Sequence, residues 1–447
     1  MKYFKVDQQT YTDLNIFTES DDSESIFGLF KKTRTLGGRD RLREIMTKPL
    51  TASKLIVDRK NAIQYFQQKK LAFEVSNSEV DLIEYYLRFD KRKSKTNLID
   101  SAVNYLSRST SNDFYIITIG IKYIIKLTAY LLDFIEEHID EKAPDYLIEQ
   151  ATKFKAIVKK GLLTETSKLV GKKLRFNQIT KFDFAFRGKE KEDILQILQL
   201  VYELDVFEHV AFIATNRKWC FANYKPSDKI EVKLTDFFHP GLKDPITNSI
   251  SIKEENNMIF LTGPNMAGKS SLLKAIGLNI YLAHLGFPVP ASQMETTFFD
   301  GLITTINLPD NINQGLSHYY SEVKRVKEVA SSLLNQQKMF VILDELFRGT
   351  NVKDAFDASL LIITELAKVK NAVFFISTHI VELAEQLKDI PNISFQYLET
   401  FFENQKPVFT YQLQQGISEE RLGMYIVQNE GIIDIIKKAY QKEQSIQ

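Results

Sequence analysis

The amino-acid sequence indicates a multidomain protein of mixed class, with an all-α N-terminal part and an α/β part built on a mostly parallel sheet. Before residue 215, apolar residues recur every three or four positions and Pro and Gly are sparse, as in amphipathic helices. From residue 218 onward, short apolar runs alternate with helical segments, which is typical of a parallel sheet covered by helices. We therefore expect a helical domain over residues 1–215 and an α/β domain over residues 216–447.

The N-terminal part is expected to form a bundle of long helices, of which Glu192–Ile213 is one. Its most apolar segment, Phe114–Ile135, is long enough to span a membrane. Lys122, Lys126 and Asp133 interrupt that segment, and charges are costly near the centre of a bilayer. We therefore interpret it as a buried bundle helix and expect no membrane contact.

The C-terminal part is expected to alternate strands and helices. The apolar run Met258–Leu261 is the first clear strand, and Ser271–Leu285 has the apolar spacing of a helix. Later strands and helices are expected at Gly301–Asn307, Tyr320–Asn335, Met339–Leu343, Asp354–Val369 and Ala372–Ser377. A central parallel strand is buried on both faces, which explains the continuous apolar runs.

The composition is that of an ordinary globular protein, with 447 residues of which 44% are hydrophobic and 26% charged. The formal net charge is +1, so overall charge does not indicate a polyanionic partner. Cys220 is the only cysteine, which excludes an internal disulfide and a cysteine zinc site. The polar N-terminus shows no signal peptide, and we expect a cytoplasmic protein.

Basic residues are concentrated locally. Lys153–Lys189 holds eleven Lys and Arg residues against two acidic ones, Glu165 and Asp183. A second cluster comprises Arg88, Lys91, Arg92, Lys93 and Lys95. Such segments can contact a phosphate backbone, but they can equally form the solvated faces of helices.

A phosphate-binding motif, G-x-x-x-x-G-K-[ST], lies between the first strand and the helix that follows it. Its glycines let the backbone aim N–H groups at phosphate oxygens, its lysine reaches the β and γ phosphates, and its serine hydroxyl is a ligand for Mg²⁺. The candidate ATP-binding residues are Gly263, Pro264, Asn265, Met266, Ala267, Gly268, Lys269, Ser270 and Ser271, with Ser270 also a metal ligand.

Two further strands deliver polar side chains where the ligands of parallel sheets bind. Asp344 and Glu345 follow an apolar run, so Asp344 is expected to hold Mg²⁺ and Glu345 to orient and polarise the attacking water. His379 follows the next strand and could sense the γ-phosphate or hold that water. The alternatives are an acidic pair that merely ends a strand and a structural histidine.

Together these residues resemble the ATPase domain of MutS-type mismatch-repair proteins, which belongs to the ABC ATPase group. The motifs that carry the resemblance are GPNMAGKS (263–270), DELFRGTN (344–351) followed by Asp354, STH (377–379), FHP (238–240), GFPVPA (286–291) and the closing stretch 411–431. Residues 33–50 and 59–63 are similar to the opening of the family's helical core domain. The resemblance implies a core/lever domain like MutS domain III followed by an ABC-type P-loop ATPase domain like MutS domain V.

Three departures from the family pattern modify that expectation. The chain begins close to the core domain, which leaves no room for a mismatch-reading domain, and we reject Phe17–Glu19 as a mismatch wedge. The stretch 66–215 is short, so the DNA clamp is expected to be reduced or absent. The family's G-R-S-T-F signature reads Gly315–Tyr319 without its arginine, and Ser317 remains. The resemblance implies that Ser317 contacts ATP in trans, across a homodimer formed by the ATPase domains, although it could also be a helix N-cap.

The resulting hypothesis is an ATP-hydrolysing DNA-binding protein of the MutS family, which moves helical arms on DNA in repair or recombination with partners not yet identified. The alternative is an ATP-switched protein-interaction module that scarcely touches DNA. On the adenine side we expect His239, with Tyr224 or Phe238 as the stacking partner.

Overall fold

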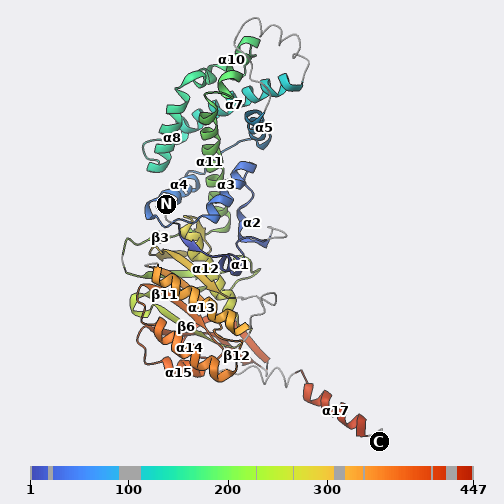
Figure 1. The fold of residues 1–447 in the computed structure, drawn as a ribbon, viewed down its shortest axis with the longest axis vertical. Helices are drawn as coiled ribbons and strands as arrows, with labels where there is room; N and C mark the ends of the chain where they lie inside the picture. The colour runs from blue at the N-terminus through green and yellow to red at the C-terminus, as the bar shows by residue number, and fades with distance from the viewer. Residues whose placement is uncertain are drawn as a thin grey trace.

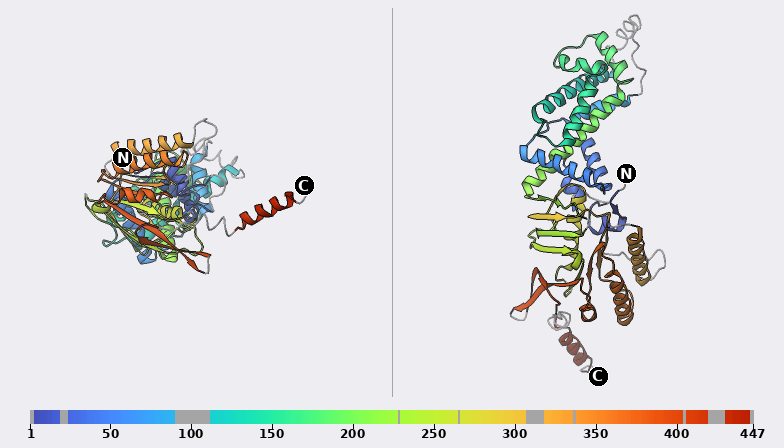
Figure 2. Two further views of the ribbon diagram at one scale, coloured as in Figure 1. Left: turned by 90° about the horizontal axis from the view of Figure 1, so that it is seen from below. Right: turned by 90° about the vertical axis from the view of Figure 1, so that its left-hand side faces the viewer.

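The computed structural model describes residues 3–18, 24–89, 112–227, 229–264, 266–306, 318–335, 338–403, 406–418 and 430–444. The molecule is elongated, with a helical arm at one end and a sheet covered by helices at the other (Figure 1). Seen from the side, the arm rises from one end of the sheet part (Figure 2). The mixed helical and α/β class expected from the sequence is confirmed.

The arm is built from helices that run along its length and return. They are α3 (Leu36–Thr47), α4 (Ser53–Lys69), α5 (Asn77–Arg88), α7 (Asn112–His138), α8 (Asp145–Val158), η2 (Gly161–Glu165), α9 (Thr166–Leu169), α10 (Phe176–Phe186) and α11 (Lys191–Arg217). Helix α11 has 27 residues, which corresponds to about 40 Å, and it connects the far end of the arm to the sheet part.

Helix α7 contains the segment whose length and apolarity suggested a membrane span. In the part of the chain that the structure describes, Asp113–His138 is the one stretch that is long and apolar enough to cross a membrane. The helix packs against α5 and α10 and buries Ile117, Ile121 and Ile124. Lys126 points outward and pairs with Glu79 of α5 at 2.5 Å. This packing is that of a bundle helix, and the absence of membrane contact stays a prediction.

The central sheet has seven strands in the order β1-β9-β10-β11-β6-β12-β13. All neighbouring strands are parallel except β12 and β13, which form an antiparallel pair at one edge. Their bounds are β1 (Lys5–Val6), β6 (Met258–Thr262), β9 (Gly301–Thr305), β10 (Met339–Asp344), β11 (Ala372–Ser377), β12 (Ile393–Glu403) and β13 (Lys406–Gln415). The strands β6, β9, β10 and β11 are buried along their whole length, as their continuous apolar runs predicted.

Helices cover both faces of this sheet. Helix α12 (Lys269–His284) packs on one face, against Ile259, Ile342 and Phe375. The opposite face carries α13 (His318–Asn335), α14 (Val352–Leu366) and α15 (Glu382–Leu387). A second, four-stranded sheet flanks α12 and contains β3 (Asn223–Tyr224), β8 (Gln293–Thr296), β4 (Glu231–Phe237) and β5 (Asn248–Lys253). The short strands β2 (Cys220–Phe221) and β7 (Pro288–Val289) pair with each other outside these two sheets. The segment η3 (Glu254–Asn256) is a single helical turn. Helix α17 (Ile432–Gln444) projects outward from the sheet part (Figure 1).

The N-terminal segment belongs to the central sheet, a feature that the sequence did not indicate. Strand β1 pairs with β9, and helix α1 (Gln8–Asp13) packs beside it. The buried Asp13 carboxylate accepts hydrogen bonds from the Thr304 hydroxyl at 2.7 Å and from the Ile306 amide at 2.9 Å. Asp7 pairs with Arg325 of α13 at 2.6 Å. We call residues 3–16 the N-terminal strap, and it precedes the short helix α2 (Ile26–Phe30).

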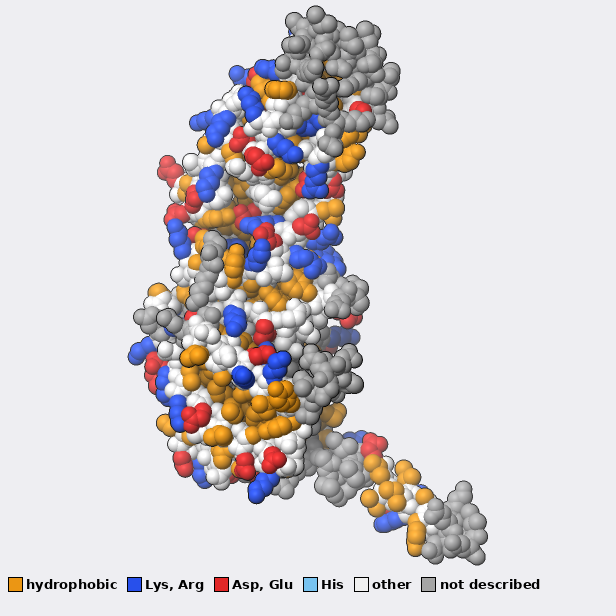
Figure 3. Space-filling model, in the orientation of Figure 1, with side chains coloured by type: hydrophobic (Ala, Val, Ile, Leu, Met, Phe, Trp, Pro, Cys, Tyr) orange, Lys and Arg blue, Asp and Glu red, His pale blue; other side chains and the backbone are white. Residues whose placement is uncertain are grey.

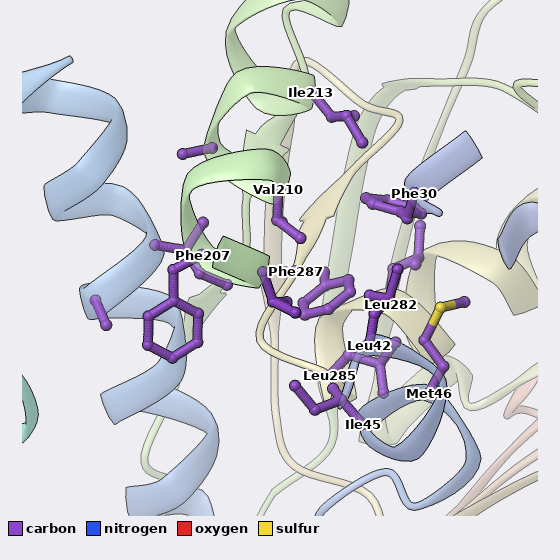
Figure 4. Packing of buried hydrophobic residues seen from close by; sticks show 14 of the residues in the cluster. Phe30, Leu42, Ile45, Met46, Phe207, Val210, Ile213, Leu282, Leu285 and Phe287 are labelled. Carbon is purple, nitrogen blue, oxygen red and sulfur yellow. The ribbon is translucent and has the colours of Figure 1, made fainter. Parts of the chain in front are cut away.

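One hydrophobic core joins the base of the arm to the sheet part. Figure 4 shows side chains of α3, α11 and α12 pointing toward one another, among them Ile45, Val210 and Leu282. Phe17 lies at its margin, 5.6 Å from the Phe27 ring centroid, so it serves as a packing residue rather than an exposed wedge. The arm therefore meets the sheet part through a packed interface rather than through a linker.

The polar contacts of this joint converge on the C-terminal end of α12. The Leu50 amide donates to the His284 carbonyl at 3.4 Å, and the Arg59 guanidinium donates to the Leu285 carbonyl at 3.0 Å. The Tyr281 hydroxyl of α12 donates in turn to the Met46 carbonyl of α3 at 2.5 Å. The arm thus supplies donors for helix carbonyls that otherwise have no partner at a helix end.

Candidate nucleotide-binding site

The glycine-rich loop connects β6 to α12, as its sequence motif predicts. Gly263 and Gly268 have φ angles of 137° and 97°, and Met266 between them has 71°. The Lys269 ammonium lies inside the loop and donates to the carbonyls of Gly263 at 2.7 Å and Pro264 at 3.1 Å. Burial lowers the pKa of Lys269, while the nearby Glu345 and Asp344 carboxylates act in the opposite direction. Asn265 lies outside the described residues, whereas the other loop residues occupy the expected connection.

The Asp344 carboxylate lies directly beside the first turn of α12. It accepts a hydrogen bond from the Ser270 hydroxyl at 2.6 Å and another from the Ser377 hydroxyl at the end of β11. A hydroxyl and a carboxylate side by side are hard oxygen ligands of the type that Mg²⁺ prefers. The residues present therefore fit a Mg²⁺ site completed by phosphate oxygens. No group of three or more His, Cys, Asp or Glu residues that could hold a metal occurs within the described ranges.

Glu345 occupies a strained position just beyond β10. Its φ angle is 53°, and its amide donates to the Ser377 carbonyl at 3.0 Å. Its carboxylate pairs with the Arg348 guanidinium at 3.1 Å. The loop that follows is held from α13, because Glu322 accepts hydrogen bonds from the amides of Arg348 and Gly349 at 3.1 and 3.2 Å. The loop thus places Glu345 next to Asp344 and gives it an exposed cationic partner, Arg348.

His379 and Ser317 are the two remaining candidate residues. His379 lies two residues beyond β11 with an exposed side chain, and the structure gives it no hydrogen bond or ion pair to another described residue. Ser317 lies outside the described residues. Their catalytic and trans-acting roles stay predictions.

A cavity of about 410 Å³ opens beside the glycine-rich loop. Its lining includes Phe238, His239, Met266, Gly268, Ser271, Leu272, Leu398 and Tyr411. The cavity therefore lies next to the loop and the first turn of α12. His239 is among the lining residues, and its contact with adenine stays a prediction.

His239 is a neutral hydrogen-bond donor in this cavity. Its Nδ1 accepts a hydrogen bond from the Gly241 amide at 3.2 Å, so the ring proton resides on Nε2. That Nε2 is buried without a partner among the described residues. Burial, with a contribution from Lys274, lowers the pKa of His239 to about 4. The imidazole is therefore neutral at physiological pH.

Tyr224 is not a stacking partner in this cavity, so that alternative was wrong. Its ring stacks on Phe298 with centroids 4.8 Å apart, and its hydroxyl donates to the Ala283 carbonyl at 2.6 Å. Of the two residues proposed to stack on the adenine, Phe238 is the one that lines the cavity. Tyr411 also lines the cavity, although the sequence analysis singled it out only as the start of the closing stretch. Its proximity to the loop depends on the pairing of β13 with β12.

The basic stretch Lys153–Lys189 lies in the outer half of the arm, over α8, η2, α9 and α10 (Figure 1). Most of its Lys and Arg side chains are exposed. Arg187 is an exception, because it is buried and pairs with Asp183 at 2.6 Å. Lys153 and Lys181 pair with acidic neighbours at 2.6 and 3.2 Å. In the second cluster Arg88 pairs with Glu84, and the other members lie outside the described residues.

The fold and site together define a protein of mixed class, in which a mostly parallel sheet with a glycine-rich loop carries a helical arm. Two family models match it. The model for MutS domain III covers residues 9–333, and the model for MutS domain V covers residues 259–447. The chain belongs to the MutS family.

Similar proteins carry the name DNA mismatch repair protein MutS. The one from Petrotoga mobilis is 24% identical over 532 residues, which covers 98% of this chain and 64% of that protein. The one from Thermotoga sp. is 28% identical over 327 residues, covering 70% and 40%. The one from Persephonella marina is 29% identical over 251 residues, covering 54% and 28%. The chain thus spans less than two thirds of the length of these relatives.

Proposed function

We propose that this chain binds and hydrolyses ATP with Mg²⁺ and uses the cycle to move its helical arm on DNA. The observation that carries the proposal is the Ser270–Asp344 contact of 2.6 Å beside the loop that encloses Lys269. This arrangement joins a phosphate-binding loop to a hard-oxygen metal site. The proposal divides the chain into a core/lever domain over residues 1–215, whose N-terminal strap pairs with the sheet of the second domain, and an ABC-type P-loop ATPase domain over residues 216–447.

Each residue of the site has a defined task. The loop amides and the N-terminal end of α12 bind phosphate oxygens, and Lys269 exchanges its loop carbonyls for the β and γ phosphates. Mg²⁺, when bound, neutralises charge that develops on the phosphates. Glu345 orients the attacking water once Arg348 releases its carboxylate. His379 stands at the neighbouring strand end and is proposed to contact the γ-phosphate or that water.

A homodimer with shared sites is the proposed assembly. Exposed apolar side chains gather on α13 and α14, including Tyr320, Val323 and Leu361, and four isoleucines and a tyrosine are exposed on α17. Figure 3 shows hydrophobic surface over this part of the molecule and along α17. Burial of such surface favours association. In the dimer, Ser317 of one subunit would contact the ATP held by the other.

Mixing two inactive variants tests the shared site. Lys269→Ala and Ser317→Ala should each have little ATPase activity alone. A heterodimer of the two variants contains one intact composite site, so mixing them should restore a measurable fraction of the wild-type rate. If Ser317→Ala alone turns over ATP at the wild-type rate, the trans role of Ser317 is wrong.

The DNA assignment rests on the family and on the exposed lysines of the arm. Backbone contacts would favour DNA structure over sequence. The alternative, an ATP-switched protein-interaction module, is favoured by the net charge of +1 and by the internal pairing of Arg187. Roles in repair or recombination, unidentified partner proteins and a cytoplasmic location remain parts of the proposal.

The deciding experiment measures ATPase rate with and without duplex, mismatched and branched DNA at two salt concentrations. Stimulation that weakens with salt supports DNA-directed function, because phosphate contacts release counterions. The ranking of the DNAs would identify the preferred structure. A rate indifferent to every DNA, with no binding at low salt, would favour the protein-interaction module.

A further inference from the structure

Tyr411 holds an unusual conformation at the wall of the cavity beside the glycine-rich loop. Its φ angle is 57°, in the left-handed region that side chains other than glycine seldom adopt. Its ring lies close to the loop, because a Cβ atom added at Gly268 would meet Tyr411 Cδ1 at 3.0 Å. Such a conformation persists only when surrounding contacts fix it.

Asn248 supplies those contacts. Its side-chain amide donates to the Tyr411 carbonyl at 2.9 Å, and its side-chain oxygen accepts a hydrogen bond from the Leu413 amide at 2.7 Å. These two hydrogen bonds hold the backbone of β13 on both sides of Gln412. Asn248 itself is buried, with 8% of its surface exposed, and it begins strand β5 of the other sheet. A side chain of one sheet therefore fixes the backbone of the other.

The same asparagine is tied to the opposite wall of the cavity. Asn248 pairs with Phe237 where β4 meets β5, and the chain leaves β4 directly into Phe238 and His239. Both of these residues line the cavity, as do Asn248 and Tyr411. Asn248 thus sets the spacing between the wall that carries His239 and the wall that carries Tyr411.

We propose that Asn248 is a positioning residue for nucleotide binding, which holds Tyr411 so that the two walls accept the base of ATP. The inference rests on the proposed function, because it requires that the cavity receives the base. Asn248 affects binding of the base through these walls, whereas the glycine-rich loop binds the phosphates. Its loss should therefore weaken ligands that carry a base and spare ligands that do not.

The test compares ATP with inorganic tripolyphosphate, which offers the phosphates without the base. Binding of each to the full chain is measured by calorimetry for wild type, Asn248→Ala and Asn248→Asp. Asn248→Asp keeps the acceptor for Leu413 but cannot donate to the Tyr411 carbonyl. We expect ATP affinity to fall roughly tenfold in both variants, as loss of one or two buried hydrogen bonds implies, with tripolyphosphate affinity unchanged. Ser251→Ala, on the exposed side of β5, is the control and should leave both affinities unchanged.

A second measurement separates positioning from general damage to the fold. Tyr411→Gly removes the ring and adopts the left-handed backbone without strain, so it should weaken ATP binding even where the backbone conformation no longer depends on Asn248. Adding Asn248→Ala to Tyr411→Gly should then cause little further loss of ATP affinity, because the two residues act through one contact. Additive losses would contradict the inference.

The outcomes distinguish this inference from the proposed function. If wild type binds neither ATP nor tripolyphosphate, or if Lys269→Ala binds both as well as wild type does, the proposed function fails. If wild type binds both and the Asn248 variants bind ATP equally well, the positioning role alone is wrong. Equal weakening of both ligands would also overturn it, since that pattern indicates damage beyond the base-binding walls.

Discussion

Lys269 is the residue on which nucleotide affinity should depend most. Its ammonium is surrounded by loop carbonyls, and a phosphate would offer it charged oxygens in their place. We expect Lys269→Ala to reduce ATP affinity by roughly 100-fold or more. Equilibrium binding of a fluorescent ATP analogue would measure this, and near wild-type affinity would disprove the assignment of the loop.

Glu345 should contribute to turnover and not to binding. Replacement by Gln keeps its size but removes the charge that polarises water, so hydrolysis should fall by roughly 100-fold or more. ATP affinity should stay within a few-fold of wild type, because Lys269 and Ser270 are intact. Single-turnover rates would test this. Equal hydrolysis rates in Glu345→Gln and wild type would remove Glu345 from the mechanism.

His284 should make the protein sensitive to acid. The ring lies at the end of α12, fully buried, with Nδ1 donating to the Ile280 carbonyl and Nε2 accepting from the Phe299 amide. Burial lowers its pKa from 6.5 to about 4. The unfolded chain therefore takes up the proton first as the pH falls, and the stabilisation, complete above about pH 6.5, is lost toward pH 4.

Urea unfolding at several pH values would measure this loss. Burial also lowers the pKa values of His209 and His239 to about 4, so each of them adds to the pH dependence of the unfolding free energy. His284→Gln should reduce the pH dependence of the unfolding free energy between pH 6.5 and 4 by about one proton. An unchanged slope in that variant would show that His284 does not contribute.

The N-terminal strap should stabilise the edge of the central sheet. Arg325 is buried, pairs with Asp7 and donates to the Thr304 carbonyl at 2.7 Å. Arg325→Ala leaves these partners without their cation, so we expect the free energy of unfolding to fall by about 3 kcal/mol. Glu328→Ala removes only an exposed partner of Arg325 and should cost less than about 1 kcal/mol. Denaturant unfolding and protease cleavage within residues 3–16 would report both effects.

Elements whose signal is local were predictable from the sequence, and those that depend on distant partners were not. The helix after the glycine-rich loop and the buried strands at Met339–Asp344 and Ala372–Ser377 matched expectation closely, because periodicity and apolar runs mark them. Strand β1 has two residues and forms only through pairing with β9. The role of Tyr411 likewise follows from a bond to Asn248 across 163 positions. Neither contact leaves a pattern in its own segment.

The joint at the end of α12 should couple the nucleotide site to the arm. The Arg59 guanidinium and the Leu50 amide both bond this end, so a rotation of α12 would be carried into α3 and α4. We expect ATP to change the distance between fluorophores placed at Lys160 on the arm and Lys388 on the sheet part. The change should be smaller in Arg59→Ala.

Labelling at two introduced cysteines would measure that distance. Burial raises the pKa of the native Cys220 thiol to about 11, so it should react slowly at neutral pH. Lys54→Ala, which changes an exposed residue of α4 outside the joint, is the matched control. A distance that does not respond to ATP in wild type would argue against a moving arm.

The placement of β1 also sets an order for synthesis. During synthesis the strap leaves the ribosome well before β9, because its partner Thr304 follows Thr10 by 294 positions. The strap therefore cannot pair with the sheet until β9 has been synthesised. Contacts between residues so far apart in the sequence slow folding. A bulky tag fused to the N-terminus would have to be accommodated at the edge of the finished sheet. Tags placed at the C-terminus, beyond α17, should give the higher yield of folded protein.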